Sequence, residues 1–214
     1  MKAAKYLIAI VVILVVAYHS IYFKKLDEIK ASRSGKEFNA ATYVQTFWNN
    51  KLMPGLNKAI DITRLTSILS IDAPKAFESY SHALGIGNLR YFLVKGTGTI
   101  GSVNEDDVTV ILQTDSSKQT ITLATEYIFG NAVRDATGLI NINEFSNTMD
   151  FNNVSAELNN IIRAKVLPPF KSAVKKGNKI EFVGAIELNK EHLNLEKIEV
   201  VPVQLRISLV ADNL

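Results

Sequence analysis

The sequence contains no cysteine, and this absence removes several structural possibilities at once. The chain can form no disulfide, offers no thiolate ligand to a metal ion and has no thiol that could carry a lipid. Cysteine usage therefore says nothing about the redox compartment in which the protein folds. Inferences about cellular location must come from the N-terminal segment.

Residues typical of catalytic sites are also scarce. The three histidines, His19, His82 and His192, lie far apart and have no carboxylate at metal-ligand spacing. No serine lies in a G-x-S-x-G motif, and the glycine-rich run at 96–101 is not followed by a helix that could cradle a phosphate. We therefore expect no catalytic residues, no metal site and no cofactor, and we predict that the protein is not an enzyme.

The charge balance argues against a nucleic-acid-binding surface. Of 24 basic and 21 acidic residues, Lys2 and Lys5 fall within residues 1–23, which hold no acid, so 22 basic and 21 acidic residues remain in the rest of the chain. Proteins that bind nucleic acids usually concentrate basic residues, because phosphate contacts supply much of their affinity. We therefore expect nucleic acid not to be the partner.

An uncharged apolar run, YLIAIVVILVVAYHSIYF, occupies residues 6–23. Its length approaches the roughly 20 residues that a helix needs to cross a bilayer. We predict a transmembrane signal anchor at 1–23 that holds the protein in the bacterial inner (cytoplasmic) membrane by a single pass. The short N-terminal flank favours export, so we expect the C-terminal domain to face the periplasm.

Cleavage of this segment as a signal peptide is the alternative, because Lys2 and Lys5 form a basic flank and 15–17 reads as a small-residue cleavage site. A polar juxtamembrane linker is predicted at 24–37. A helical subdomain follows at 38–87, where apolar residues recur at helical spacing. Within it we predict helix caps at Asp61 and Asp72, Pro74 in a first turn and Gly85 as a helix stop.

Beyond residue 88 the hydrophobic period changes to two. Strands are predicted at 91–103, 108–114, 120–127, 179–188 and 198–209, with a helix at 154–167 capped by Asn152 or Asn153 and ended by Pro168 and Pro169. This order predicts a mainly β protein with helices (α+β), in which 88–214 forms a five-stranded OB-like Greek-key barrel. Three glycines would let the first strand bend and pair on both sides. An open half-barrel or a helix-capped sheet would show the same order.

The segment GNAVRDATGLININEFSN, residues 130–147, holds the best candidates for a binding site. It lies between a strand and a helix, and loops on rigid scaffolds often carry function. We select Arg134, Asp135, Asn143 and Asn147 as candidate ligand- or partner-binding residues, because arginine offers a planar fork to carboxylates, phosphates or hydroxyls. The alternative is structural: an ion pair that fastens the loop, with asparagines in turns and caps.

Several stretches, taken in order, resemble a known family. They are FNAATYVQTFWNNKLMPGL at 38–56, VKGTGTIGSV at 94–103, GNAVRDATGLININEFSNTMDFNNVSAELN at 130–159, KIEFVGAIEL at 179–188 and VVPVQL at 200–205. In these the chain resembles a bacterial family of predicted periplasmic lipoproteins, a domain family of unknown function.

The resemblance implies an OB-like barrel with an N-terminal helical part, a location outside the cytoplasmic membrane and a gene neighbourhood that often includes sugar uptake transporters. Relatives commonly carry a lipidated cysteine where this chain has His19 and Ser20, so the apolar helix itself must hold this protein. We expect a non-enzymatic, membrane-anchored extracytoplasmic binding or accessory protein, with sugar-transport components among its partners. An OB-fold binder of oligosaccharide or nucleic acid is the alternative.

Overall fold

The computed structural model describes residues 18, 38–113 and 118–208. The chain divides into two compact units, Met1–Phe38 and Asn39–Leu214, and the helices and strands given below lie in the second unit.

The predicted domain boundaries relate to this division in two ways. The boundary between the helical subdomain at 38–87 and the barrel domain at 88–214 falls inside the second unit. The predicted anchor at 1–23 and linker at 24–37 lie outside the described residues, apart from Tyr18. Among the residues that the structure does describe, no helix has both the length and the apolar character needed to span a membrane.

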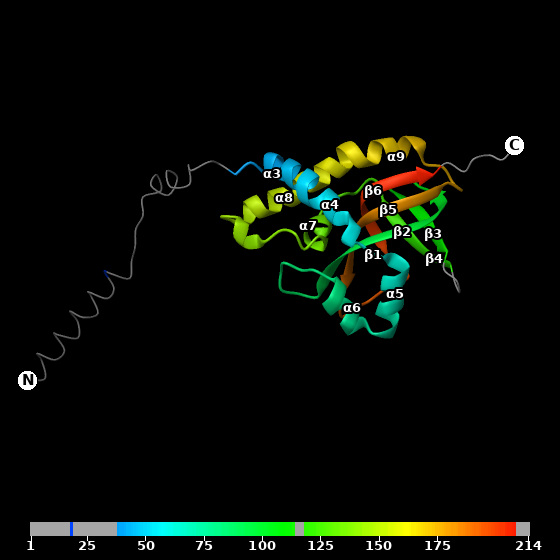
Figure 1. The fold of residues 1–214 in the computed structure, drawn as a ribbon, viewed down its shortest axis with the longest axis horizontal. Coiled ribbons are helices and arrows are strands. Elements are labelled where there is room, and N and C mark those ends of the chain that lie inside the picture. Colours follow the sequence, from blue (N-terminus) through cyan, green and yellow to red (C-terminus); the bar gives the residue numbers. More distant parts are fainter. Residues whose placement is uncertain (1–17, 19–37, 114–117, 209–214) are drawn as a thin grey trace, which may run out of the picture. The chain divides into compact units, whose positions relative to one another are not determined.

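Six strands form one mixed sheet with helices on both sides (Figure 1). The strands are β1 (Ile60–Asp61), β2 (Leu89–Val103), β3 (Asp107–Gln113), β4 (Lys118–Ala124), β5 (Lys179–Asn189) and β6 (Glu199–Ser208). Their order is β1-β2-β3-β4-β6-β5, and β2 pairs in addition with β5. The parallel contact of β4 with β6 spans only the pairs Thr122–Glu199 and Leu123–Val200. The sheet is therefore strongly curled but is not closed into a barrel along the full length of β4 and β6.

The mixed α+β class that the sequence predicts is confirmed, and all five predicted strands are present within a few residues of their predicted bounds. The count of five is wrong, because β1 adds a sixth strand. This strand pairs in parallel with β2 at Val94 and Lys95. Two residues are too few to show an alternating pattern, so periodicity could not reveal it.

Seven α-helices surround the sheet in the described part of the unit. They are α3 (Ala40–Phe47), α4 (Met53–Gly55), α5 (Ile62–Ile71), α6 (Ala73–Tyr80), α7 (Ala132–Ala136), α8 (Thr148–Ile161) and α9 (Leu167–Ala173). The predicted caps at Asp61 and Asp72 are confirmed: Asp61 accepts from the backbone N–H of Thr63, and Asp72 accepts from that of Lys75. The cap predicted at Asn152 or Asn153 is wrong, because both residues lie inside α8, whose N-cap is Asn147. Pro74 lies in the first turn of α6, also as predicted.

The helix predicted at 154–167 is longer at both ends. It begins at Thr148, six residues before the predicted start, and runs through a π-helical turn at Ile162–Val166 into α9. The two prolines do not end it, because they lie in the first turn of α9, where proline is tolerated. Resetting the hydrogen-bond register in the π-helical turn lets α8 continue into a proline-containing helix.

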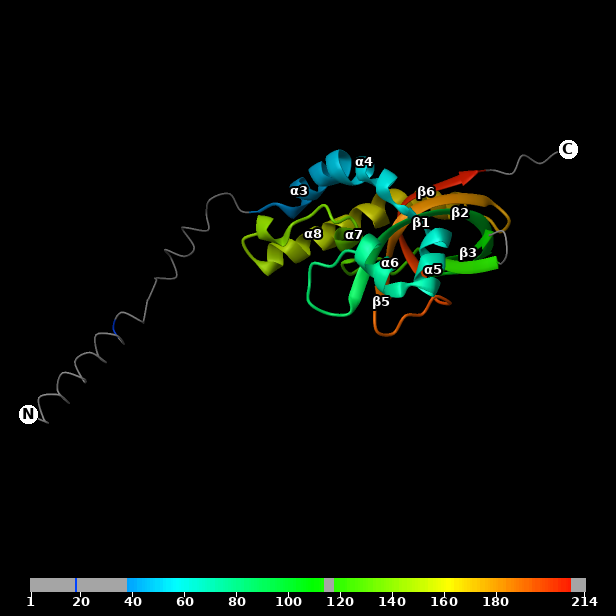
Figure 2. The ribbon, with the colours of Figure 1, turned by 60° about the horizontal axis from the view of Figure 1, so that its bottom comes forward.

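The main hydrophobic core fills the curled sheet beneath α5 and α6. Helix α5 contributes Ile62, Leu65 and Leu69, and Phe77 of α6 packs on Phe92 of β2 with ring centroids 5.4 Å apart. Helices α5 and α6 lie on one side of the sheet and α9 on the other, while α3 runs beside α8 (Figures 1 and 2). The layer of α3, α7 and α8 thus forms a second packed region next to the curled sheet.

Glycines in β2 make room for neighbouring elements. A Cβ atom on Gly98 would lie 2.5 Å from Cγ1 of Val110 and 2.7 Å from the backbone oxygen of Ile111, and one on Gly96 would lie 2.8 Å from the ring of Phe182. As the sequence predicts, β2 pairs on both sides, with β5 along most of its length and with β3 at its end. Close backbone approach, rather than bending alone, is what these positions require.

We expect Gly98→Ala to lower the free energy of unfolding by about 1–3 kcal/mol, because strand β3 must move to admit the new methyl group. Gly85→Ala is the matched control, since a Cβ there would meet nothing within 4 Å. Denaturant titration of the two variants measures the difference. Equal stabilities would contradict the close-approach explanation.

Candidate ligand-binding site

Arg134 and Asp135, the adjacent charges that the sequence singles out, form a buried ion pair. They lie in α7, whose five residues are all buried. Nε of Arg134 donates to Oδ1 of Asp135 at 2.6 Å, and Nη2 donates to Oδ2 at 3.3 Å. The two side chains are 4% and 5% exposed, so solvent and salt screen the pair little. A two-point contact between guanidinium and carboxylate is a strong and geometrically specific form of ion pair.

Phe151, in the first turn of α8, completes the surroundings of Arg134. Nη1 of Arg134 donates to the backbone oxygen of Phe151 at 3.2 Å, and the guanidinium carbon lies 3.6 Å from the centroid of the Phe151 ring. A cation over an aromatic face is attracted by the ring quadrupole, most strongly when desolvated. Arg134 therefore fastens α7 to the beginning of α8.

The segment between β4 and α7 is fastened along the helix that runs from α8 into α9. We call residues 126–131 the strap. Four side chains of the helix donate to successive points of the strap: Ser155 to Asn131, Asn159 to the carbonyl of Gly130, Arg163 to the carbonyl of Ile128, and Lys171 to Glu126. The strap and the helix therefore run antiparallel, and their contacts hold α7 in place beside α8.

A row of aromatic rings connects α3 to the same point. The ring centroids of Phe145 and Phe151 are 5.4 Å apart, as are those of Tyr43 and Phe145. The hydroxyl of Tyr43 donates to the carboxylate of Glu144 at 3.1 Å. Burial, and then the charge of Glu144, raise the pKa of Tyr43 to about 12. The row therefore packs α3 against the segment that precedes α8 (Figure 2).

Tyr91 of β2 brings the sheet into the site. Its side chain is buried, and it lies directly across from Glu187 of β5. Burial of the phenol, followed by the charges of Glu187 and Asp135, raises the pKa of Tyr91 to about 12, while Arg134 acts in the opposite direction. The phenol is therefore protonated at neutral pH and donates a hydrogen bond to Glu187.

A pocket of about 310 Å³ lies against the ion pair, near the lower end of the roughly 300–1,000 Å³ typical of small-molecule sites. One wall is the loop at 83–89, which lies beside α7 (Figures 1 and 2). The ends of this loop are held together because His82 and Tyr91 exchange backbone hydrogen bonds of 2.8 and 3.0 Å. The facing wall comes from α7, the residue before it and the start of α8: Asn131, Arg134, Asp135, Thr148, Phe151 and Asn152.

The structure places two of the four sequence-predicted site residues together. Arg134 and Asp135 line this pocket. Asn143 is exposed, and its backbone N–H donates to the side chain of the asparagine two residues earlier. Asn147 is the N-cap of α8, and its Oδ1 accepts from the N–H of Asp150 at 2.8 Å. Neither asparagine lines the pocket; both take the turn and cap positions that the structural interpretation assigned to them.

Sequence reasoning missed the remaining wall of the pocket. Nothing in the local sequence marks Tyr91. Asn131 lies in the candidate segment but was not selected, and Asn152 was predicted only as a helix cap. The glycines of the loop at 83–89 are a sequence signal, but the prediction of Gly85 as a helix stop is wrong, because α6 already ends at Tyr80. Two glycines flanking an exposed isoleucine indicate a projecting loop better than a helix end.

Other places in the described residues are less well built. A depression of about 240 Å³ lies over β2, β5 and β6, and three of its four charged residues, Lys95, Glu181 and Arg206, are exposed. Within the described ranges, no group of three or more His, Asp or Glu side chains is arranged to hold a metal ion. The pocket beside Arg134 is therefore the better candidate, because buried charged groups and a shaped cavity coincide there.

We expect Arg134→Ala to lower the free energy of unfolding by about 3–5 kcal/mol, because the variant leaves the Asp135 carboxylate buried without its partner. The Arg134→Ala/Asp135→Ala double variant should lose less than the sum of the single losses, with a coupling of about 1–3 kcal/mol. Denaturant titrations of the wild type, both single variants and the double variant measure this cycle.

Lys171→Ala provides the control, because the 2.5 Å pair of Lys171 with Glu126 has side chains 40% and 53% exposed. We expect it to cost less than about 1 kcal/mol. Strict additivity in the Arg134–Asp135 cycle, or an effect as small as that of the control, would contradict a stabilising role for the buried pair.

Comparison with solved structures gives a match over most of the chain. An OB-fold protein from Thermotoga maritima MSB8, with a crystal structure at 1.90 Å, is 27% identical and superposes with a TM-score of 0.72; the match covers 81% of this chain and 100% of that one. The S. pombe Stn1–Ten1 complex matches at 9% identity over 57% of this chain and 67% of that one, with a TM-score of 0.27, which is too low to support any argument. Comparison with curated proteins gives no match.

The comparison with family models identifies the chain more directly. The model described as "Predicted periplasmic lipoprotein (DUF2291)" matches residues 11–206, which cover nearly the whole chain and include the described residues that line the pocket. The resemblance stated from the sequence is therefore confirmed, and the OB-fold neighbour agrees with it. The chain belongs to this family of predicted periplasmic lipoproteins, DUF2291.

Proposed function

We propose that the protein is a non-enzymatic, extracytoplasmic binding protein that takes a small, neutral, hydroxyl-rich molecule such as a sugar in the pocket beside Arg134. In this proposal it serves as an accessory to sugar uptake components, and the curled sheet acts as an OB-like barrel that supports the helical layer. The family's description as periplasmic supports the location. The pocket supports the binding role.

The observation that carries the proposal is the neutralised ion pair in the pocket wall. Among the described residues that line the pocket, Arg134 and Asp135 are the only charged ones, and each cancels the charge of the other. The same wall holds the amides of Asn131 and Asn152 and the hydroxyl of Thr148. Amides and hydroxyls both donate and accept hydrogen bonds, so this wall suits an uncharged ligand with several hydroxyl groups.

A second candidate is the binding of an oligosaccharide on the open face of the sheet. The depression over β2, β5 and β6 supports it, because Thr97, Gln204 and the exposed charged groups there offer hydrogen bonds to an extended polar chain. Lys95→Ala separates the candidates, since Lys95 lines the depression and does not line the pocket.

We expect glucose or maltose to raise the melting temperature of the full chain, because a ligand that binds the folded state alone stabilises it. Asn152→Ala should abolish the shift by removing a hydrogen-bonding group from the pocket wall. Asn153→Ala is the control, because this neighbouring asparagine is exposed and does not line the pocket. A shift that persists in Asn152→Ala and disappears in Lys95→Ala would favour the open sheet face.

The proposal also includes attachment to the inner membrane by residues 6–23, because this apolar run is uncharged and the chain has no cysteine to carry a lipid. We expect the protein to stay in the membrane fraction after alkaline carbonate extraction, with an intact mass that includes residues 6–23. Recovery in the soluble periplasmic fraction with Tyr18 as the new N-terminal residue would show cleavage instead.

A further inference from the structure

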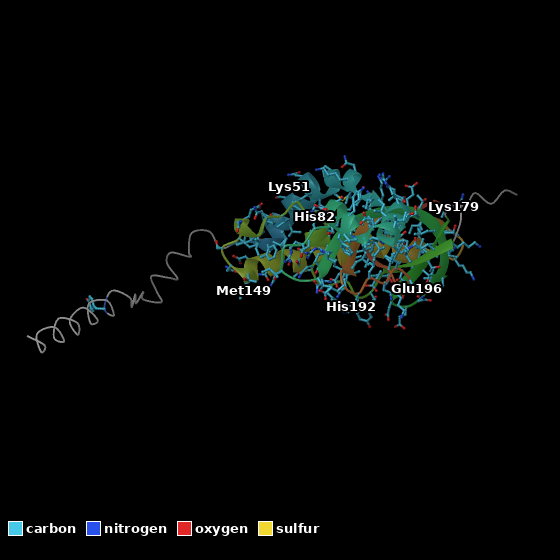
Figure 3. All side chains as sticks on the ribbon, turned by 90° about the horizontal axis from the view of Figure 1, so that it is seen from below. Lys51, His82, Met149, Lys179, His192 and Glu196 are labelled. Carbon is cyan, nitrogen blue, oxygen red and sulfur yellow. The ribbon has the colours of Figure 1, made fainter. Side chains whose placement is uncertain are left out.

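Exposed aliphatic side chains gather at the mouth of the pocket. Among the residues that line it, Ile86 is fully exposed, Leu89 is 44% exposed and Ile142 is 43% exposed. We call these three residues the apolar rim. Met149, which is 71% exposed, lies in the same helical turn as the lining residue Thr148. Figure 3 shows Met149 at the end of the Asn39–Leu214 unit that lies away from Lys179.

Such a cluster requires an explanation, because single exposed aliphatics are ordinary but a group around one cavity is not. The rim residues come from two segments that are far apart in the sequence: Ile86 and Leu89 from the loop at 83–89, and Ile142 from the turn after α7. The fold therefore brings together apolar surface that is separate in the sequence and sets it over a polar wall.

The polar wall below the rim selects for an uncharged group. Arg134 uses three of its five N–H donors on Asp135 and Phe151, which leaves two without a partner among the described residues. These donors belong to a cation whose charge Asp135 already balances. A hydroxyl or amide oxygen can accept from them without bringing a second negative charge into the site.

The loop is built to present its apolar side chain over the pocket. Its ends are held by the backbone bridge between His82 and Tyr91, and Nη1 of Arg90 donates to the carbonyl of Gly87 at 2.8 Å. Gly87 has a φ of +147°, a value that side chains rarely permit. The base of the loop is thus fixed, while Ile86 stands at its exposed tip between two glycines. A compact loop of this kind with closely spaced ends is frequently functional.

We propose that the ligand is a neutral amphiphile, with a hydroxyl-bearing head against Arg134, Asn131 and Asn152 and an alkyl chain against the apolar rim. This inference rests on the proposed function and narrows its ligand from a sugar to a sugar-like head that carries an aliphatic chain. Burying aliphatic surface on both the chain and the rim supplies the additional affinity, because each buried CH₂ group contributes favourably.

The test uses octyl β-glucoside with a photoreactive diazirine in its alkyl chain, added below its micellar concentration to membranes that contain the full chain. We expect saturable labelling, mapped by mass spectrometry, within residues 84–89 and 142–152. Octyl β-glucoside should displace the label at a concentration at least about ten-fold lower than glucose, because each 1.4 kcal/mol of burial corresponds to a factor of ten.

The double variant Ile86→Ser/Ile142→Ser should reduce this labelling by about five-fold or more while leaving the melting temperature unchanged. Ile71→Ser is the matched control, because Ile71 is 86% exposed at the end of α5 and does not line the pocket. Glucose that competes as well as octyl β-glucoside, with no effect of the double variant, would overturn the inference and leave the proposed function standing. Unsaturable labelling, or labelling confined to residues 6–23, would also overturn it, while the separate glucose melting experiment decides the proposed function.

Discussion

The buried pair of Arg134 and Asp135 is the interaction on which the helical layer depends. Removing two charges from water costs several kcal/mol for each ion, and their attraction offsets this only when the geometry is good and further hydrogen bonds support the pair. Here the offset comes from the two-point contact with Asp135, the backbone oxygen of Phe151 and the ring of Phe151. Because the backbone oxygen and the ring of Phe151 both belong to α8, the pair can stay buried only while the first turn of α8 lies over α7.

The remaining contacts of the layer follow from this requirement. The strap at 126–131 holds α7 in place through hydrogen bonds to the helix that runs from α8 into α9. The row of rings from Tyr43 to Phe151 holds α3 against the start of α8. Tyr91 of β2 connects the sheet to the same site, because its phenol interacts with the charges of Glu187 and Asp135. The floor of the pocket is therefore assembled from elements that are held rigidly for reasons of stability. The loop at 83–89 is held at its base by the backbone hydrogen bonds between His82 and Tyr91, and it adds the exposed Ile86 to the wall.

The sequence predicts what depends on local chemistry and misses what depends on distant partners. Asp61 and Asp72 were found as caps because a cap satisfies backbone groups two or three residues away. The pairing of Arg134 with Asp135 was foreseen as one of two interpretations, since the residues are neighbours. Phe151 as the third member was not, because seventeen residues and a turn separate it from Arg134. The extension of the helix past Pro168 also needed the structure, since a π-helical turn leaves no simple pattern.

The candidate pocket and the apolar run lie in different units of the chain. A family described as lipoproteins implies attachment through a lipid, and none of the 214 residues is a cysteine that could carry one. Every residue of the pocket wall and of the apolar rim lies within Asn39–Leu214, whereas the apolar run lies within Met1–Phe38. The residues that form the buried pair, the strap and the aromatic row all lie in the second unit. The proposed membrane attachment and the proposed ligand site can therefore be tested by changes in separate parts of the sequence.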